Sequence, residues 1–248
     1  LHDALPIWYY QQLTRFSTAF ALLADVSMFV IGGSLKRKEK LSARLGDVLS
    51  LLYLSSTALK FYDQRGRQQD ELPLLRWALY DSAFKIQVAL DGIIQNFPSR
   101  AIAFVLRRLV FPRGLTLIQP SDQMGHEVAD LLIQPSAVRS RLIAGIYLPK
   151  DENDLMGKLE AAMHAVIAAE PVDAKVKAAK KAGRITTQGA ESQYEEAMKL
   201  SVISETELAL WKRARALQHD IIMVDDFDKD FDRKQADQPA WQQAAAAE

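Results

Sequence analysis

The chain has 248 residues, 31 basic and 31 acidic side chains that give a formal net charge of zero, and no cysteine. Because nucleic-acid-binding proteins usually carry a basic excess, the balance argues against that class. The lack of cysteine excludes disulfides and thiolate metal sites. An apolar share of 49% and a charged share of 25% are ordinary for a globular protein.

The first seven residues differ from the rest of the chain. They have neither the basic head of a signal peptide nor an initiator methionine, and they do not continue the helical pattern that begins at Trp8. We expect residues 1–7 to be a non-native junction. The chain would then be a fragment whose true N-terminal part is missing.

Two long helices are predicted at residues 8–31 and 38–64, with Gly32 and Gly33 between them. Apolar residues cover so much of the first helix that we expect it inside a bundle. Its two rows are Leu13, Phe16, Phe20, Leu23, Ser27 and Val30, and Ala19, Leu22, Val26 and Phe29. The stripe of the second helix is Leu41, Leu45, Val48, Leu52, Ser55 and Leu59. A short connection makes the two helices antiparallel neighbours.

The first of these helices is not expected to cross a membrane. Its most apolar run, residues 16–31, is shorter than the roughly 20 residues that a span needs, and it contains Asp25, which is costly in lipid. We therefore interpret it as a buried core helix.

A third long helix begins near Asp70 and keeps an apolar row from Leu75 to Phe97, before Pro98. An arginine-rich helix is predicted at 99–111, and then a loop at 115–120 that we expect to pack on the bundle. Shorter helices are predicted at 121–133, 136–144, 153–169, 171–182, 190–200 and 204–221, the first of them capped by Ser121. Ser204 and Glu207 form a capping box at the start of the last one.

No strand pattern occurs in the sequence, so the predicted fold is all-α. We expect an antiparallel helical bundle at residues 8–115, made of a long hairpin of two buried helices plus a third. A part with shorter helices, residues 116–224, would pack on it. Residues 225–248 carry seven acidic and three basic side chains, and we expect a flexible, disordered tail.

The glycine pair Gly32-Gly33 comes after a helix and matches neither a P-loop nor a dinucleotide-binding turn, so it predicts a helix stop. The cations just beyond it are Lys36, Arg37, Lys38 and Lys40. A solvated helix start explains them. The alternative is a surface that contacts an anionic membrane or a partner protein.

Other polar groups receive structural interpretations. Asp122 and Asp130 flank His126 at one helical turn on either side, which is compatible with a metal site but favours an exposed charge pattern. Arg44 and Asp47 are three residues apart, so they can pair with each other or across the bundle, and we expect a satisfied structural ion pair.

A basic cluster, Arg100, Arg107, Arg108, Arg113, Arg139 and Arg141, leaves a polyanion or phospholipid site as an alternative. The carboxylates Glu195, Glu196, Glu205 and Glu207 have no feature of acid–base catalysts. From the residues alone we therefore predict a helical domain with no catalytic, cofactor-binding or metal-binding residue.

Several blocks resemble one known family. They are residues 9–28 (YYQQLTRFSTAFALLADVSM), 35–40 (LKRKEK), 42–50 (SARLGDVLS), 96–100 (NFPSR), 120–122 (PSD), 135–141 (PSAVRSR) and 224–227 (VDDF). The family is the bacterial acyl-coenzyme A dehydrogenases of fatty-acid β-oxidation, and the blocks are similar to its bacterial-type C-terminal domain. The likeness extends from about Tyr9 to Phe231.

The resemblance implies a flavoprotein oxidoreductase that introduces the α,β double bond into medium- or long-chain acyl-CoA. FAD and the catalytic base would lie upstream, so the fragment alone would bind no cofactor and be inactive, as a scaffold or oligomerisation extension. Implied partners are acyl-CoA, electron-transfer flavoprotein and further copies of the chain, but not nucleic acid. The implied location is cytoplasmic, with peripheral contact at the inner membrane. The alternative is a stand-alone interaction or membrane-docking module without enzyme activity.

Overall fold

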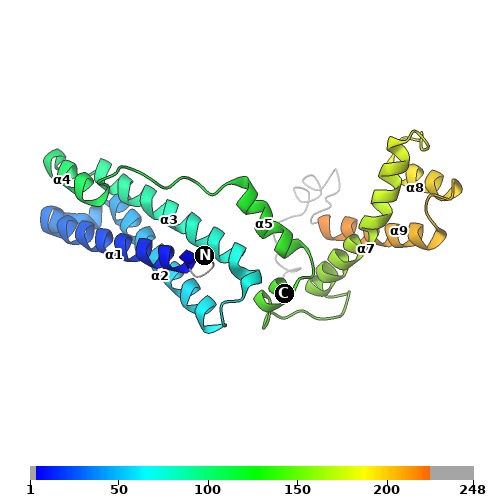
Figure 1. Cartoon of the computed structure of the whole chain (residues 1–248), viewed down its shortest axis with the longest axis horizontal. Coiled ribbons are helices and arrows are strands. Elements are labelled where there is room, and N and C mark those ends of the chain that lie inside the picture. The colour runs from blue at the N-terminus through cyan, green and yellow to red at the C-terminus, as the bar shows by residue number, and fades with distance from the viewer. Residues whose placement is uncertain (1–3, 224–248) are drawn as a thin grey trace, which may run out of the picture. The chain divides into compact units, whose positions relative to one another are not determined.

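The computed structural model describes residues 4–223, with side chains from residue 7 onward. Within that range the chain forms helices and no strand, so the predicted all-α class is confirmed (Figure 1). The expected disordered tail at 225–248 lies outside the described residues. The chain divides into two compact units, residues 1–142 and 143–248.

Three long helices build the first unit: α1 (Ala4–Ile31), α2 (Glu39–Gln64) and α3 (Leu72–Gln95). The helix α1 begins at Ala4 rather than at Trp8. The predicted stripes of α2 and α3 face the core, with Val48, Ile86 and Leu90 fully buried. Because burying one large aliphatic side chain contributes about 1.5–3 kcal/mol, these rows stabilise the predicted antiparallel hairpin and its third helix.

The prediction that α1 lies inside the bundle is wrong for one side of the helix. Phe16 and Leu23 are fully buried, but Phe29 is 93% exposed and Val30 is also exposed. The reason is that α1 packs on α2 and α3, which leaves its opposite side uncovered. The segment Ile7–Arg37 is long and apolar enough to cross a membrane by length and composition alone, unlike the shorter run at 16–31. Phe16, Ala19 and Leu23 of this segment belong to the bundle core, although only 17% of its most apolar window is buried.

The helix α4 (Arg100–Val110) begins next to its predicted start, where the Ser99 hydroxyl accepts from the Ile102 amide. The connection from α4 to α5 then runs along α3 (Figure 1). The buried side chain of Gln87 holds it there: its amide nitrogen donates to the Leu117 carbonyl at 2.8 Å, and its oxygen accepts from the Thr116 and Leu117 amides at 3.0 Å. The predicted packing of this loop on the bundle is therefore confirmed.

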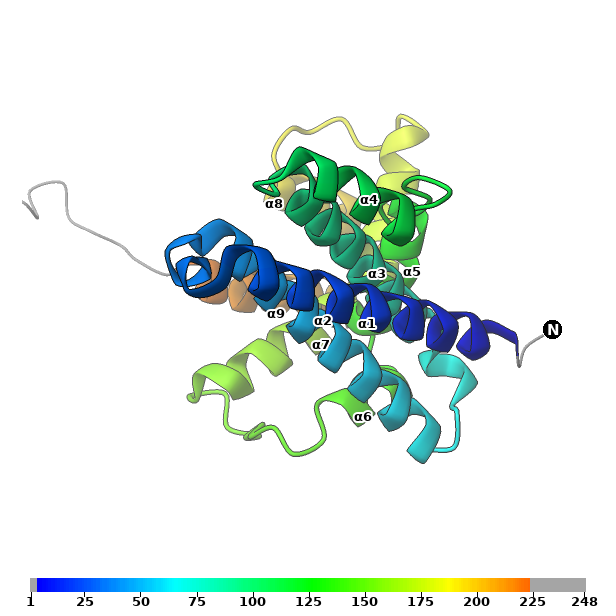
Figure 2. The same cartoon turned by 90° about the vertical axis from the view of Figure 1, so that its left-hand side faces the viewer.

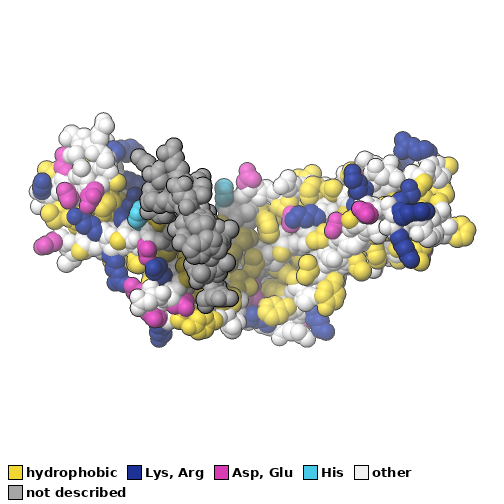
Figure 3. Space-filling view, turned by 180° about the vertical axis from the view of Figure 1, so that it is seen from behind, with side chains coloured by type: hydrophobic (Ala, Val, Ile, Leu, Met, Phe, Trp, Pro, Cys, Tyr) yellow, Lys and Arg dark blue, Asp and Glu magenta, His cyan; other side chains and the backbone are white. Residues whose placement is uncertain are grey.

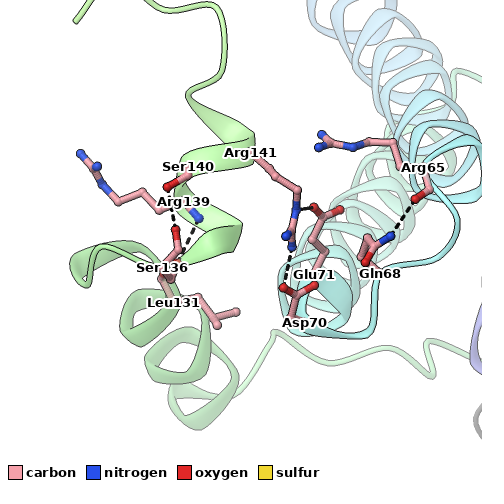
Figure 4. Close-up of polar contacts among 9 residues, drawn as sticks. All are labelled: Arg65, Gln68, Asp70, Glu71, Leu131, Ser136, Arg139, Ser140 and Arg141. Atoms are coloured by element: carbon pink, nitrogen blue, oxygen red, sulfur yellow. Dashed lines mark hydrogen bonds and ion pairs between the residues drawn. The ribbon is translucent and has the colours of Figure 1, made fainter.

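The first unit also contains α5 (Asp122–Ile133) and α6 (Ala137–Leu142). A division was predicted at residue 115, whereas the compact units divide after Leu142. The helix α5 packs on α3, and Arg141 of α6 pairs with Glu71 and Asp70 just before α3 (Figure 4). These contacts hold both short helices to the bundle.

The second unit consists of α7 (Leu155–Lys181), α8 (Ala190–Lys199) and α9 (Glu205–Ile222). Two helices were predicted where α7 runs unbroken through Pro171, so that prediction is wrong. Proline inside a helix costs about 3 kcal/mol. Beyond Pro171, Val172, Val176 and Ala179 are buried in the core of this unit, and their burial offsets that cost.

The core of the second unit is centred on two aromatic rings. Tyr194 of α8 stacks on Trp211 of α9 with ring centroids 3.9 Å apart. The Tyr194 hydroxyl donates to Asp173 of α7, and burial raises the pKa of this phenol, with the carboxylate adding to the effect. The predicted capping box of Ser204 and Glu207 is present at the start of α9. Through Tyr194, which contacts both Trp211 and Asp173, the three helices α7, α8 and α9 are linked.

Candidate functional site

The candidate site is the turn between α1 and α2, which we call the hairpin tip and define as residues 28–40. Gly32 ends α1 with φ at +57°, a conformation that residues with a side chain rarely adopt. The 3₁₀ helix η1 (Gly32–Arg37) comes next, and the Lys38 amide donates to the Leu35 carbonyl at 3.0 Å before α2 begins. The prediction that the glycines stop the helix is confirmed. Figures 1 and 2 show the turn at one end of the first unit.

The four predicted surface cations lie together on this turn. Lys36, Arg37, Lys38 and Lys40 are all exposed. Within residues 4–223 no ion pair involves any of them, although Glu39 lies between two of them. These four side chains therefore face the solvent and do not stabilise the fold through ion pairs.

Two apolar side chains of the hairpin tip, in the last turn of α1, are exposed as well. Met28 is 66% exposed and Phe29 is 93% exposed. Figure 3 shows hydrophobic side chains beside Lys and Arg on the bundle. Phe29 was predicted to lie in the core, so the sequence indicated the basic half of this surface but not the apolar half. The row Ala19, Leu22, Val26 and Phe29 gave no signal that its last member lies on the side of α1 that α2 and α3 leave uncovered.

The tip offers no cradle for a nucleotide or for FAD. A Cβ atom added to Gly32 or to Gly33 would meet no other atom within 4 Å, so the backbone there projects outward. Phosphate-binding turns instead wrap their backbone amides around the anion.

The other sequence candidates make structural contacts. Asp122, His126 and Asp130 are all exposed on α5, and no group of three metal-binding side chains occurs in the part of the chain that the structure describes. The expected ion pair of Arg44 and Asp47 is wrong. Asp47 is exposed, while Arg44 lies along α3 in the space left by Gly92, where a Cβ would be 2.9 Å from its Nε.

The arginine cluster is mostly occupied by intramolecular contacts. Arg107 pairs with the buried Asp91, and Arg108 lies over the Phe104 ring at 5.6 Å. Arg141 Nε donates to Glu71 at 2.5 Å and its Nη2 to Asp70 at 2.6 Å (Figure 4). This hydrogen bond from Arg141 lowers the pKa of Asp70. The polyanion alternative loses its support, because these guanidinium groups already bind protein partners.

The glutamates are likewise engaged in the fold. Glu196 accepts from the Thr187 amide at 2.9 Å, and hydrogen bonds from Thr187 lower its pKa. Glu207 accepts from Lys175 and from the Ser204 amide, which lowers its pKa too. Glu195 pairs with Lys212. A general base needs a pKa near the working pH, and these shifts move the carboxyls Glu196 and Glu207 away from it.

Comparison with known proteins adds one positive finding. Residues 5–227 match the protein family described as "Acyl-CoA dehydrogenase, C-terminal, bacterial type". No solved structure matches the chain. The family match spans both compact units and begins inside the seven residues that were predicted to be a junction.

Proposed function

The chain belongs to the family of bacterial-type C-terminal domains of acyl-CoA dehydrogenases, and we propose that it is the non-catalytic C-terminal part of such an enzyme. The family acts on acyl-CoA, is FAD-dependent in general and is generally oligomeric. The proposed whole enzyme introduces the α,β double bond into medium- or long-chain acyl-CoA in fatty-acid β-oxidation and passes electrons to electron-transfer flavoprotein. The observation that carries the proposal is the match over residues 5–227.

The proposed role of the chain itself is that of a scaffold for the flavin-binding part and for oligomerisation. Exposed apolar side chains on helices of the bundle support this role, because such surfaces commonly mark protein contacts. They include Leu49 and Tyr53 on α2, and Phe104 and Leu109 on α4. The proposed location is the cytoplasm, with peripheral contact at the inner membrane through the hairpin tip.

The test compares three proteins: the enzyme encoded by the whole reading frame, the same enzyme without these 248 residues, and the 248 residues alone. Acyl-CoA-dependent reduction of electron-transfer flavoprotein and the oligomeric state by light scattering are measured for each. We expect full activity only in the whole enzyme, and a colourless, inactive 248-residue protein.

The outcomes separate the parts of the proposal. Flavin absorbance or acyl-CoA oxidation by the 248 residues alone would contradict the non-catalytic role. Unchanged activity and oligomeric state after their deletion would contradict the scaffold role. A reading frame without a flavin-binding part would favour the alternative, a stand-alone interaction or membrane-docking module, for which the exposed tip is the specific supporting observation.

A further inference from the structure

We propose that the hairpin tip binds the surface of a bilayer that contains anionic phospholipid. In this mode Phe29 and Met28 enter the boundary between headgroups and acyl chains, and Lys36, Arg37, Lys38 and Lys40 contact lipid phosphates. The inference rests on the peripheral location included in the proposed function, and it names the residues and the lipid chemistry that would produce that location.

The apolar side chains of the tip are exposed to water, which is unfavourable, and insertion into a bilayer removes this exposure. Phe29 is 93% exposed and Met28 is 66% exposed, at the end of α1 where α2 and α3 do not cover them. Helices that bind at the membrane interface place aromatic and aliphatic side chains at this depth, with basic residues beside them. Transfer of one phenyl side chain out of water corresponds to at least about a tenfold gain in binding.

The basic half supplies attraction to the headgroups. Four cations lie within five consecutive positions, with Glu39 as the only acid among them. All four are exposed, and among residues 4–223 none is neutralised by an ion pair. Each Lys or Arg near an anionic membrane surface contributes about a fivefold gain in binding.

A bilayer fits this tip better than a protein partner does. Protein interfaces are depleted in lysine, whereas three of the four cations here are lysines. The backbone at Gly32 and Gly33 also projects outward with free space around it, so the tip is convex. A soft lipid surface can accept such a projection without a matching cavity, and lysine stems extend along it while their ammonium groups stay hydrated.

The experiment is vesicle flotation of the 248-residue chain. The vesicles contain either phosphatidylcholine alone or phosphatidylcholine with about 30% phosphatidylglycerol, an anionic fraction that gives a marked negative surface potential. We expect binding to the mixed vesicles at about 0.1 M salt, weak binding to phosphatidylcholine, and release at about 0.5 M salt because the attraction is screened.

Two variants test the two halves of the tip. The variant K36Q/R37Q/K38Q/K40Q is expected to lose more than about a hundredfold in the partition coefficient, and Phe29→Ser about tenfold. Their matched controls are K177Q/K180Q/K181Q/K199Q, which removes the same charge from exposed lysines of the second unit, and Phe61→Ser, at the opposite end of α2. Circular dichroism confirms that each variant keeps its helices.

The inference is overturned if the wild-type chain does not float with the anionic vesicles, or if the tip and control variants lose binding equally. Equal loss of vesicle binding would mean that exposed cations anywhere on the chain contribute to binding, and not those of the hairpin tip in particular. Tip-dependent capture of an acidic protein without vesicle binding would assign the tip to a protein partner instead. None of these readouts uses acyl-CoA oxidation, so a failure here is distinguishable from a failure of the proposed enzyme function.

Discussion

At the scale of single residues, one glycine in α7 allows a close approach of two backbone segments that a side chain would prevent. Gly157 lies in the first turn of α7, and a Cβ there would be 2.1 Å from the Asp151 carbonyl oxygen and 2.9 Å from that of Pro149. Backbone atoms cannot move aside as a flexible side chain does. The segment that leads into α7 therefore depends on a glycine at this position.

We expect Gly157→Ala to lower the free energy of unfolding of the second unit by about 1–3 kcal/mol, because it forces a steric clash with backbone atoms. The matched control is Gly46→Ala in α2, where a Cβ would meet nothing within 4 Å. Alanine there should stabilise its helix by about 1 kcal/mol. Urea unfolding followed by circular dichroism measures both, and equal effects would contradict the steric argument.

At the scale of elements, the α1–α2 hairpin depends on the apolar stripe that α2 presents to α1 and α3. We expect Leu52→Asp to lower the free energy of unfolding by several kcal/mol, because it buries a charge without a partner. Phe20→Asp should cost less, since Phe20 is only partly buried. The control Leu54→Asp, at a 60% exposed position of the same helix, should leave thermal melts nearly unchanged.

The short helix α6 is held to the bundle by an electrostatic contact that depends on pH. The hydrogen bond from Arg141 places the folded-state pKa of Asp70 below its unfolded value. The stabilisation by this group is therefore complete above about pH 4 and is lost as the pH falls through the folded-state pKa. We expect wild type to be more stable than Asp70→Asn at about pH 6, and the difference to shrink as the pH falls below about 4.

This prediction is checked by the urea midpoints of both proteins between about pH 6 and pH 2. A difference that stays constant over that range would show that the asparagine acts through something other than the loss of a titrating carboxylate. The contact between Arg141 and Asp70 is partly solvent-accessible, so high salt should reduce the difference at the upper end of the range.

At the scale of the whole molecule, the chain consists of two compact units with separate cores. Residues 143–154 connect α6 to α7 without helical structure, and most of them are exposed. Exposed, irregular segments are the preferred sites of proteolysis. We expect limited trypsin digestion to cut first at Lys150, the only lysine or arginine in this connection, and to leave two resistant fragments. First cleavage inside α2 or α3 would contradict this division.

The helices and their caps were predicted from the sequence better than the contacts between helices were. The stripe of α2, the row of α3, the cap Ser121 and the capping box of α9 were all predicted correctly, because helical period and cap chemistry are local properties. The continuation of α7 through Pro171 was missed, since the burial that compensates for the proline comes from α8 and α9, distant in sequence.

The basic cluster at the hairpin tip was visible in the sequence, but its apolar neighbour Phe29 was assigned to the core. Periodicity indicates which residues share a side of a helix. It does not indicate which side of the helix its neighbours cover, and Phe29 lies on the side of α1 that α2 and α3 leave exposed.

By itself the sequence determined the all-α class, the family resemblance and the absence of a nucleotide-binding motif, because composition, periodicity and short motifs need no long-range contact. The tertiary structure alone decided which side of α1 is buried, that Arg44 lies against α3 instead of pairing with Asp47, and that Phe29 and the four cations of the hairpin tip are all exposed. Such facts depend on which helices are neighbours, and in a bundle that is set by the packing of all the apolar stripes at once.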